Sequence, residues 1–196
     1  ALSMGSLVER ARSAEQSGEW EAALGYYADA FRLLTTEGDA AAAADILRST
    51  GAVHWQRGGG GLAEEHYEAS LAIAECANLP LTRARALNAM AVLEQFRGRI
   101  DRARELYGAA RAIAEQVPDD RMLAMIDQNL GTLANIEGDT TSALDSYGRA
   151  LKGFRRVADS RGQVWALINM GIAHTDIGGW DDAEACFADA FEVADA

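Results

Sequence analysis

The sequence repeats itself every 40 residues, and this period constrains the fold more than any other feature. One position of five consecutive units holds Gly18, Gly58, Gly98, Gly138 and Gly178. Nine residues further on, each unit has an aromatic side chain: Tyr27, Tyr67, Tyr107, Tyr147 and Phe187. Between these two positions, every unit has an alanine. A period of this length, kept in register without gaps, indicates a stack of equivalent structural units.

Each unit predicts two helices separated by a glycine turn. Over about 14 residues before each glycine, apolar side chains such as Met90 and Leu93 recur with helical spacing. The glycine ends this first helix because it adopts the left-handed conformation without penalty, and a second helix begins about two residues later. Small residues near the end of the first helix let the pair approach closely, and the aromatic side chain fills the gap to the neighbouring pair. Asp39, Asp119 and Ser160 are candidate N-caps of first helices.

One helical pair cannot bury its apolar face alone, whereas stacked pairs bury a continuous core. The predicted fold is therefore all-α: an α-solenoid of five tandem helix–turn–helix units, with about ten antiparallel helices in a single domain. The expected repeats cover residues 1–38, 39–78, 79–118, 119–158 and 159–196. The fifth unit stops within its second helix and leaves Phe187, Phe191 and Val193 uncovered. We expect that the chain is part of a longer protein, or that this edge packs against a second copy in a homodimer.

Charge is strongly negative and unevenly distributed. Thirty acidic residues against 18 basic ones give a net charge of -12, which disfavours direct binding to nucleic acid. The fifth unit alone carries -7, whereas the third carries +3. We expect the arginines of the third unit to pair with acids of neighbouring units, except Arg85. No apolar run approaches the roughly 20 residues of a membrane helix, and no signal peptide is visible, so we predict a cytoplasmic protein without a membrane partner.

Residues that could carry catalysis or hold a metal form no recognisable pattern. The run Gly58 to Gly61 lacks the Lys-Ser/Thr of a phosphate-binding loop and reads as a turn. The three histidines and two cysteines match no zinc spacing, and Cys76 and Cys186 fit small core positions. No nucleophile elbow is present. We therefore predict that the protein is not an enzyme and needs neither metal nor cofactor.

The repeat columns resemble those of the tetratricopeptide repeat family. The fourth unit carries them as Leu130, Gly131, Gly138, Ala143, Tyr147 and Ala150. The fifth carries them as Met170, Gly171, Gly178, Trp180, Ala183, Phe187 and Ala190. The family's usual tyrosine in the first helix is replaced by Ala14, His54, Glu94, Ala134 and His174. The 40-residue period and segments such as Asn129-Leu130-Gly131 resemble kinesin light chains and the repeat domains of bacterial signalling and transcription regulators.

This resemblance implies that the first helices line the concave surface of a right-handed superhelix. Their faces that point away from the second helices would then meet a ligand. The peptide-binding residues expected there are Arg12, Arg48, Trp55, Arg85, Asn88, Gln95, Phe96, Gln128, Asn129, Asn135, Trp165 and Asn169. Amide side chains can bond an extended peptide backbone, arginines can hold a carboxylate, and the aromatic side chains can form apolar pockets.

Three functions remain open at this point. The first is a non-enzymatic interaction module that binds a peptide or protein segment along the concave face. The second is a sensory or regulatory domain of a bacterial transcription regulator or signalling ATPase, which would bind a small effector or an adjacent catalytic domain. The third is a structural spacer that self-associates through its C-terminal edge.

Overall fold

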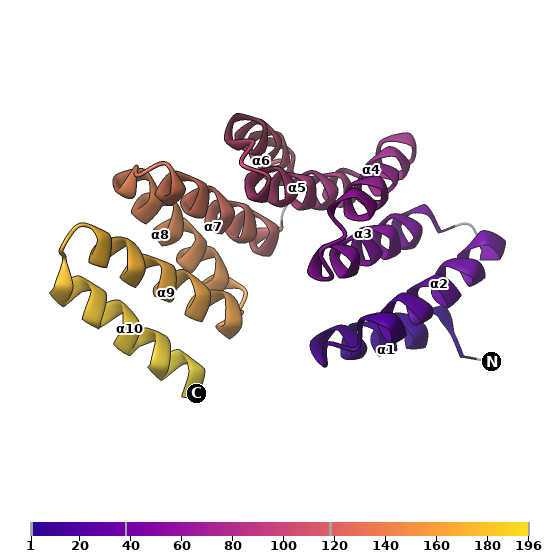
Figure 1. Ribbon diagram of the computed structural model, residues 1–196, viewed down its shortest axis with the longest axis horizontal. Helices are drawn as coiled ribbons and strands as arrows, with labels where there is room; N and C mark the ends of the chain where they lie inside the picture. The colour runs from indigo at the N-terminus through magenta and orange to yellow at the C-terminus, as the bar shows by residue number, and fades with distance from the viewer. Residues whose placement is uncertain (1, 38, 118, 196) are drawn as a thin grey trace. The chain divides into compact units, whose positions relative to one another are not determined.

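The computed structural model describes residues 2–37, 39–117 and 119–195. Over these residues the chain forms ten α-helices and no strand, which confirms the predicted all-α class (Figure 1). The helices are α1 (Met4–Gln16), α2 (Trp20–Glu37), α3 (Ala40–Gln56), α4 (Gly60–Cys76), α5 (Pro80–Phe96), α6 (Ile100–Ala114), α7 (Asp120–Ile136), α8 (Thr140–Arg156), α9 (Ser160–Asp176) and α10 (Trp180–Asp195). Odd-numbered helices are the first helices of the repeats, and even-numbered helices are the second.

The turn between the two helices of each repeat is built by its glycine. All five repeat glycines have φ between +72° and +81°, which is the left-handed conformation expected of a residue just beyond a helix end. The short turn brings the two helices together as an antiparallel pair, as α1 with α2 and α9 with α10 show (Figure 1).

Aspartates begin most of the first helices. The carboxylates of Asp39 and Asp119 accept hydrogen bonds from backbone N–H groups three residues later, which confirms both predicted N-caps. The third prediction was one residue off. Ser160 is the first residue of α9, and the cap is Asp159, whose carboxylate accepts from the Gly162 N–H at 3.0 Å.

Glycine in the first helix lets the aromatic ring of the second helix lie directly on its backbone. A Cβ atom on Gly131 would stand 2.6 Å from the Tyr147 ring, and one on Gly51 would stand 2.6 Å from the Tyr67 ring. The predicted close approach is therefore confirmed. The aromatic residue also has a second role, because Tyr147 packs against Ala173 of the next pair as well as within its own pair.

The chain divides after Leu93 into two compact units, termed here the N-terminal unit and the C-terminal unit. The N-terminal unit holds α1 to α4 and most of α5, with Ala11, Tyr27 and Val53 among its buried residues. The C-terminal unit holds the end of α5 and α6 to α10, with Phe154 and Leu167 buried between α8 and α9.

Two further sequence expectations concern surface properties. Cys76 is exposed rather than in the core, and Cys186 is half-buried. Burial, together with the neighbouring Asp189 and Asp182 carboxylates, raises the pKa of the Cys186 thiol. Among the described residues, no helix is both long and apolar enough to cross a membrane.

Candidate functional site

One position of the 40-residue repeat carries different kinds of side chain in the two units. It holds Gly5, Asp45 and Arg85 in the N-terminal unit, and Met125 and Trp165 in the C-terminal unit. The Met125 side chain is 42% exposed and that of Trp165 is 63% exposed. Both side chains leave much of their apolar surface uncovered, and exposed apolar side chains that lie together mark candidate binding surfaces.

The exposed apolar residues of the C-terminal unit continue along two first helices. Met125 and Asn129 lie one helical turn apart on α7, and Trp165, Asn169 and Ile172 follow the same spacing on α9. Ile172 is 44% exposed, and both asparagines are half-buried. Met125 and Asn129 occupy the same repeat positions as Trp165 and Asn169, on two helices that contact each other, and these four residues together with Ile172 are termed here the amide–apolar face.

A buried carboxylate anchors α7 beneath this face. Asp127 is buried, and its Oδ1 accepts from the Nε of Arg111 on α6 and from the Nε of Arg149 on α8, both at 3.2 Å. Arg149 also donates to the Ser146 hydroxyl at 2.9 Å. Charge-assisted bonds from two helices to one buried group hold α7 in place, so the face is presented on a rigid support.

In the N-terminal unit, the corresponding surface is occupied by ion pairs. Asp45 Oδ2 accepts from Arg85 Nη1 at 3.4 Å, and Arg48 Nε lies 3.6 Å from Asp45 Oδ1. The three side chains are each about one-third exposed. Arg48 and Arg85, expected to hold a ligand's carboxylate, therefore already face a carboxylate of the protein.

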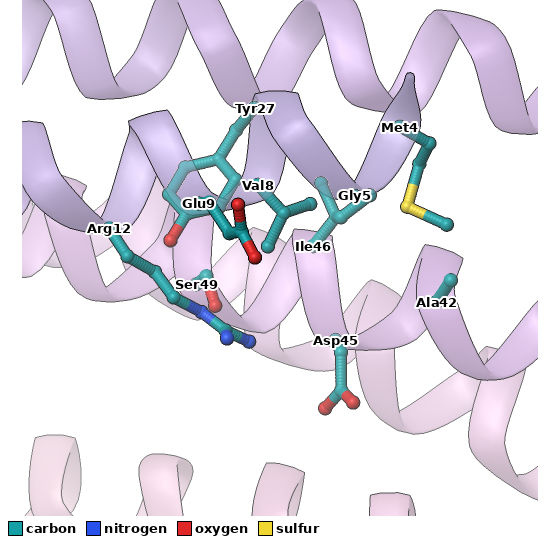
Figure 2. A pocket seen from close by; sticks show the side chains of 10 residues that line it. All are labelled: Met4, Gly5, Val8, Glu9, Arg12, Tyr27, Ala42, Asp45, Ile46 and Ser49. Atoms are coloured by element: carbon teal, nitrogen blue, oxygen red, sulfur yellow. The ribbon is translucent and has the colours of Figure 1, made fainter.

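A pocket of about 280 Å³ lies between α1, α2 and α3 in the N-terminal unit (Figure 2). It is lined by Met4, Gly5, Val8, Glu9, Arg12, Tyr27, Ala42, Asp45, Ile46 and Ser49. Of the expected peptide-binding residues, Arg12 lines this pocket and is exposed.

Two ionisable groups beside the pocket have shifted pKa values. Burial raises the pKa of the Glu15 carboxyl, and the Tyr27 hydroxyl and the guanidinium groups of Arg48 and Arg12 oppose this shift. Burial and then the Glu15 carboxylate raise the pKa of Tyr27 to about 12. The two groups are close enough to influence each other, yet both Glu15 Oε1 and the Tyr27 hydroxyl lie buried without hydrogen-bond geometry to any described group.

The remaining expected residues are dispersed. Trp55 is half-buried and packs against the cluster of Tyr67 and Leu93. Gln95 accepts a hydrogen bond from the Tyr107 hydroxyl at 3.0 Å. Asn135 is half-buried, and Phe96 at the end of α5 is 68% exposed. These four do not belong to the amide–apolar face.

Two expected ligand contacts are in the interior. Asn88 is 7% exposed and Gln128 is 4% exposed, which corrects the expectation that both side chains face a ligand. Each stands one residue before the repeat position that Asn129 and Asn169 occupy on the amide–apolar face. Because one residue turns a helix by about 100°, these side chains point into the packing between helices.

The arginines of the third repeat pair with acids, but not always in neighbouring repeats as expected, and Arg85, the expected exception, pairs with Asp45 of the preceding repeat. Arg97 and Arg99 both contact the Glu94 carboxylate, and Arg104 contacts Glu137 of the following repeat. Hydrogen bonds from Arg99, with smaller contributions from Arg97, lower the pKa of Glu94. The positive charge of this repeat is thus largely matched by acids of the protein.

Several functional candidates could not be picked out from the sequence. Tyr27 occupies the aromatic packing column, so nothing in its repeat position distinguishes it as a pocket wall. Ile136 is 57% exposed at the end of α7. It occupies the same repeat position as Phe96, which was expected to be exposed, and this correspondence could have identified it from the sequence. In the described part of the chain, no cluster of three or more His, Cys, Asp or Glu side chains could hold a metal ion.

The outer side of α10 carries uncovered apolar side chains. Trp180 is 67% exposed and Phe191 is 73% exposed. The acidic charge of this repeat opposes the approach of an identical surface. Homodimer formation through this edge stays a prediction.

The sequence model of the tetratricopeptide repeat matches residues 82–156 and 121–196. The two matches together cover more than half of the chain. The chain belongs to the tetratricopeptide repeat family. Its fold is accordingly an all-α solenoid of helix pairs, as the repeat columns predict. No curated protein sequence matches this tetratricopeptide repeat chain.

Solved structures with similar folds come from several tetratricopeptide-like proteins. BtubC (BKLC) from P. vanneervenii has a TM-score of 0.77 and 21% identity, over 97% of this chain and 79% of that one. A Rap protein complexed with competence and sporulation factor has a TM-score of 0.86 and 17% identity, over 97% and 54%. The Rap conjugation gene regulator of plasmid pLS20, in complex with the Phr* peptide, has a TM-score of 0.85 and 14% identity, over 97% and 53%. This chain spans about half the length of both Rap proteins.

Proposed function

We propose that the protein is an interaction module that binds an extended peptide or protein segment on the amide–apolar face of α7 and α9. The observation that carries this proposal is the 63% exposed Trp165 on α9, with exposed Ile172 further along the same helix and exposed Met125 at the same repeat position of α7, which contacts α9. Tryptophan is strongly enriched among residues that dominate binding energy, because it contributes a large contact area with little loss of conformational freedom.

The chemistry of the face favours an apolar rather than an acidic segment. Asn169 can donate to and accept from a peptide backbone, while Met125 and Trp165 can receive alternate side chains of an extended ligand. Arg48 and Arg85 in the N-terminal unit already face Asp45. Support also comes from the Rap regulator of similar fold that was solved with the Phr* peptide.

The test uses two tryptophans of the same unit. A peptide is first selected for binding to the full chain from a random displayed library. Its affinity is then measured for wild type, Trp165→Ala and Trp180→Ala, because Trp180 is 67% exposed but lies on α10. We expect Trp165→Ala to weaken binding by roughly 10- to 100-fold, and Trp180→Ala to change it by less than about twofold.

Equal effects of the two substitutions would contradict the proposal, as would a selected peptide that is sensitive to Trp180 alone. Both side chains are exposed, so neither substitution should lower the melting temperature appreciably. An unchanged melting temperature separates a binding effect from loss of folding.

A further inference from the structure

The pocket of the N-terminal unit has two chemically distinct ends. Met4 and Ala42 lie at one end, and Val8 and Ile46 continue this apolar lining (Figure 2). Arg12 lies at the other end. A site that is apolar at one end and carries a few convergent polar groups at the other has the make-up of a small-molecule site.

The polar groups at the Arg12 end include one that is buried without a partner. Tyr27 is 1% exposed and lines the pocket, and its hydroxyl lies outside hydrogen-bond geometry, although the Glu15 carboxyl and the Ser49 hydroxyl are near enough to shift its pKa. Ser49 adds a second hydroxyl beside it. Leaving a buried hydroxyl unpaired costs about 1–3 kcal/mol, so such a group calls for a ligand atom or water.

The charged groups of the pocket are also incompletely satisfied. Asp45 Oδ1 is buried and has no hydrogen-bond partner among the described groups, although Arg48 lies within ion-pair distance. Arg12 and Glu9 are exposed at the pocket rim, and neither forms an ion pair within the described part of the chain. The pocket thus offers an exposed guanidinium and an exposed carboxylate at its rim, and one Asp45 oxygen that has no hydrogen-bond partner beside the ion pairs of that residue.

We propose that this pocket binds a free α-amino acid with an aliphatic side chain. The ligand carboxylate would accept hydrogen bonds from the Arg12 guanidinium and the Tyr27 hydroxyl. Its ammonium group would donate to Glu9 and to Asp45 Oδ1, and its side chain would lie against Val8 and Ile46. The volume of about 280 Å³ is near the lower limit of roughly 300 Å³ for ligand pockets, which suits a molecule of this size.

The pairing of opposite charges decides between a free amino acid and the end of a peptide. A peptide C-terminus brings a carboxylate but leaves Glu9 without a cation. A peptide N-terminus brings the ammonium group but leaves Arg12 with no anion other than the nearby Glu15 carboxylate. This proposal does not depend on the peptide-binding proposal, because the pocket lies in the N-terminal unit and the amide–apolar face lies in the C-terminal unit.

Calorimetric titration of the full chain with capped and uncapped ligands tests the proposal. The probes are L-leucine, L-isoleucine, L-valine and L-methionine, followed by N-acetyl-L-leucine and L-leucinamide. We expect at least one free amino acid to bind, and the two capped forms of leucine to bind more weakly than leucine by roughly tenfold or more, since each loses one charge-assisted contact. Absence of binding by all four amino acids at millimolar concentration would overturn the proposal. Equal binding of a capped form would also overturn it and would identify a peptide end as the ligand.

Three variants locate the bound amino acid. Arg12→Gln and Tyr27→Phe should each weaken binding, Arg12→Gln by roughly tenfold or more because it removes the charged donor. Arg10→Gln is the matched control, because Arg10 is an exposed arginine of the same helix that does not line this pocket. Arg12 is exposed, so its replacement should not impair folding. Binding that is insensitive to Arg12→Gln, or equally sensitive to Arg10→Gln, would contradict the assignment.

Discussion

The two units of this protein are built on the same repeat but use their first-helix surfaces differently. In the N-terminal unit one repeat position holds Asp45 and Arg85, which form an ion pair with each other. In the C-terminal unit the same position holds Met125 and Trp165, which are exposed. Of the exposed large apolar side chains among the described residues, three lie in the N-terminal unit and nine in the C-terminal unit. The comparison shows that the packing columns fix the fold while the surface positions are free to diverge in chemistry.

The largest expected difference between the units concerns their charge networks. Arg111→Met with Arg149→Met leaves Asp127 buried without a cation, and we expect the free energy of unfolding to fall by about 3 kcal/mol. Arg48→Met with Arg85→Met removes the matching pair around Asp45, whose side chain is 33% exposed, and should cost at most about 1 kcal/mol. Urea unfolding followed by circular dichroism measures both values. Equal losses would show that the two networks do not differ in burial as described.

A smaller difference concerns how the contributions of two glutamates to the free energy of unfolding depend on pH. The pKa of Glu94, in the C-terminal unit, is lowered, so its carboxylate stabilises the fold above the ordinary pKa near 4.5 and this contribution is lost as pH falls through the lower folded value. At pH 7 we expect Glu94→Gln to lower the free energy of unfolding by about 1–2 kcal/mol. This deficit should shrink below pH 4.5.

The pKa of Glu15, in the N-terminal unit, is shifted in the opposite direction. Burial raises its pKa, so its charge opposes folding, and this cost grows as pH rises from 4.5 through the folded value. Glu15→Gln should leave stability at pH 7 unchanged or slightly higher. Urea unfolding between pH 4 and pH 7 measures both variants, and a loss at pH 7 for Glu15→Gln equal to that for Glu94→Gln would refute the contrast.

The smallest expected effect lies in the turns that join one repeat to the next. Asn78 and Ala158 occupy the same repeat position, and both have a φ of +52°. Alanine pays a steric penalty in this conformation, whereas asparagine tolerates it better. Ala158→Gly should raise the free energy of unfolding by about 0.5–1 kcal/mol, and Asn78→Gly should change it by only a few tenths. Thermal melts of the two variants compare them, and a larger gain for Asn78→Gly would contradict this reading.

The fold could be predicted from the sequence because its determinants are local and recur five times. A glycine that must adopt positive φ, and a small residue beneath an aromatic ring, leave the chain few alternatives. The wrongly predicted cap at Ser160 shows how precisely a helix start can be predicted. Asp and Ser both favour the N-cap position, and only the observed backbone shows that Asp159 is the cap.

The candidate site was only partly predictable for a geometric reason. Gln128 and Asn129 are neighbours with similar side chains, yet Gln128 is 4% exposed and Asn129 is half-buried. A rotation of about 100° between them decides which side chain points inward, and an amide at either position satisfies the sequence pattern. The pocket was unpredictable because it depends on how α1, α2 and α3 meet around Tyr27.

The central claim is that the first helices of the C-terminal unit, and not its outer edge, bind the partner segment. Hydrogen–deuterium exchange of the full chain, with and without the selected peptide, measures this directly. We predict slower exchange in α7 and α9 when the peptide is bound, with α10 unchanged. Slower exchange confined to α10 or to the N-terminal unit would contradict the claim.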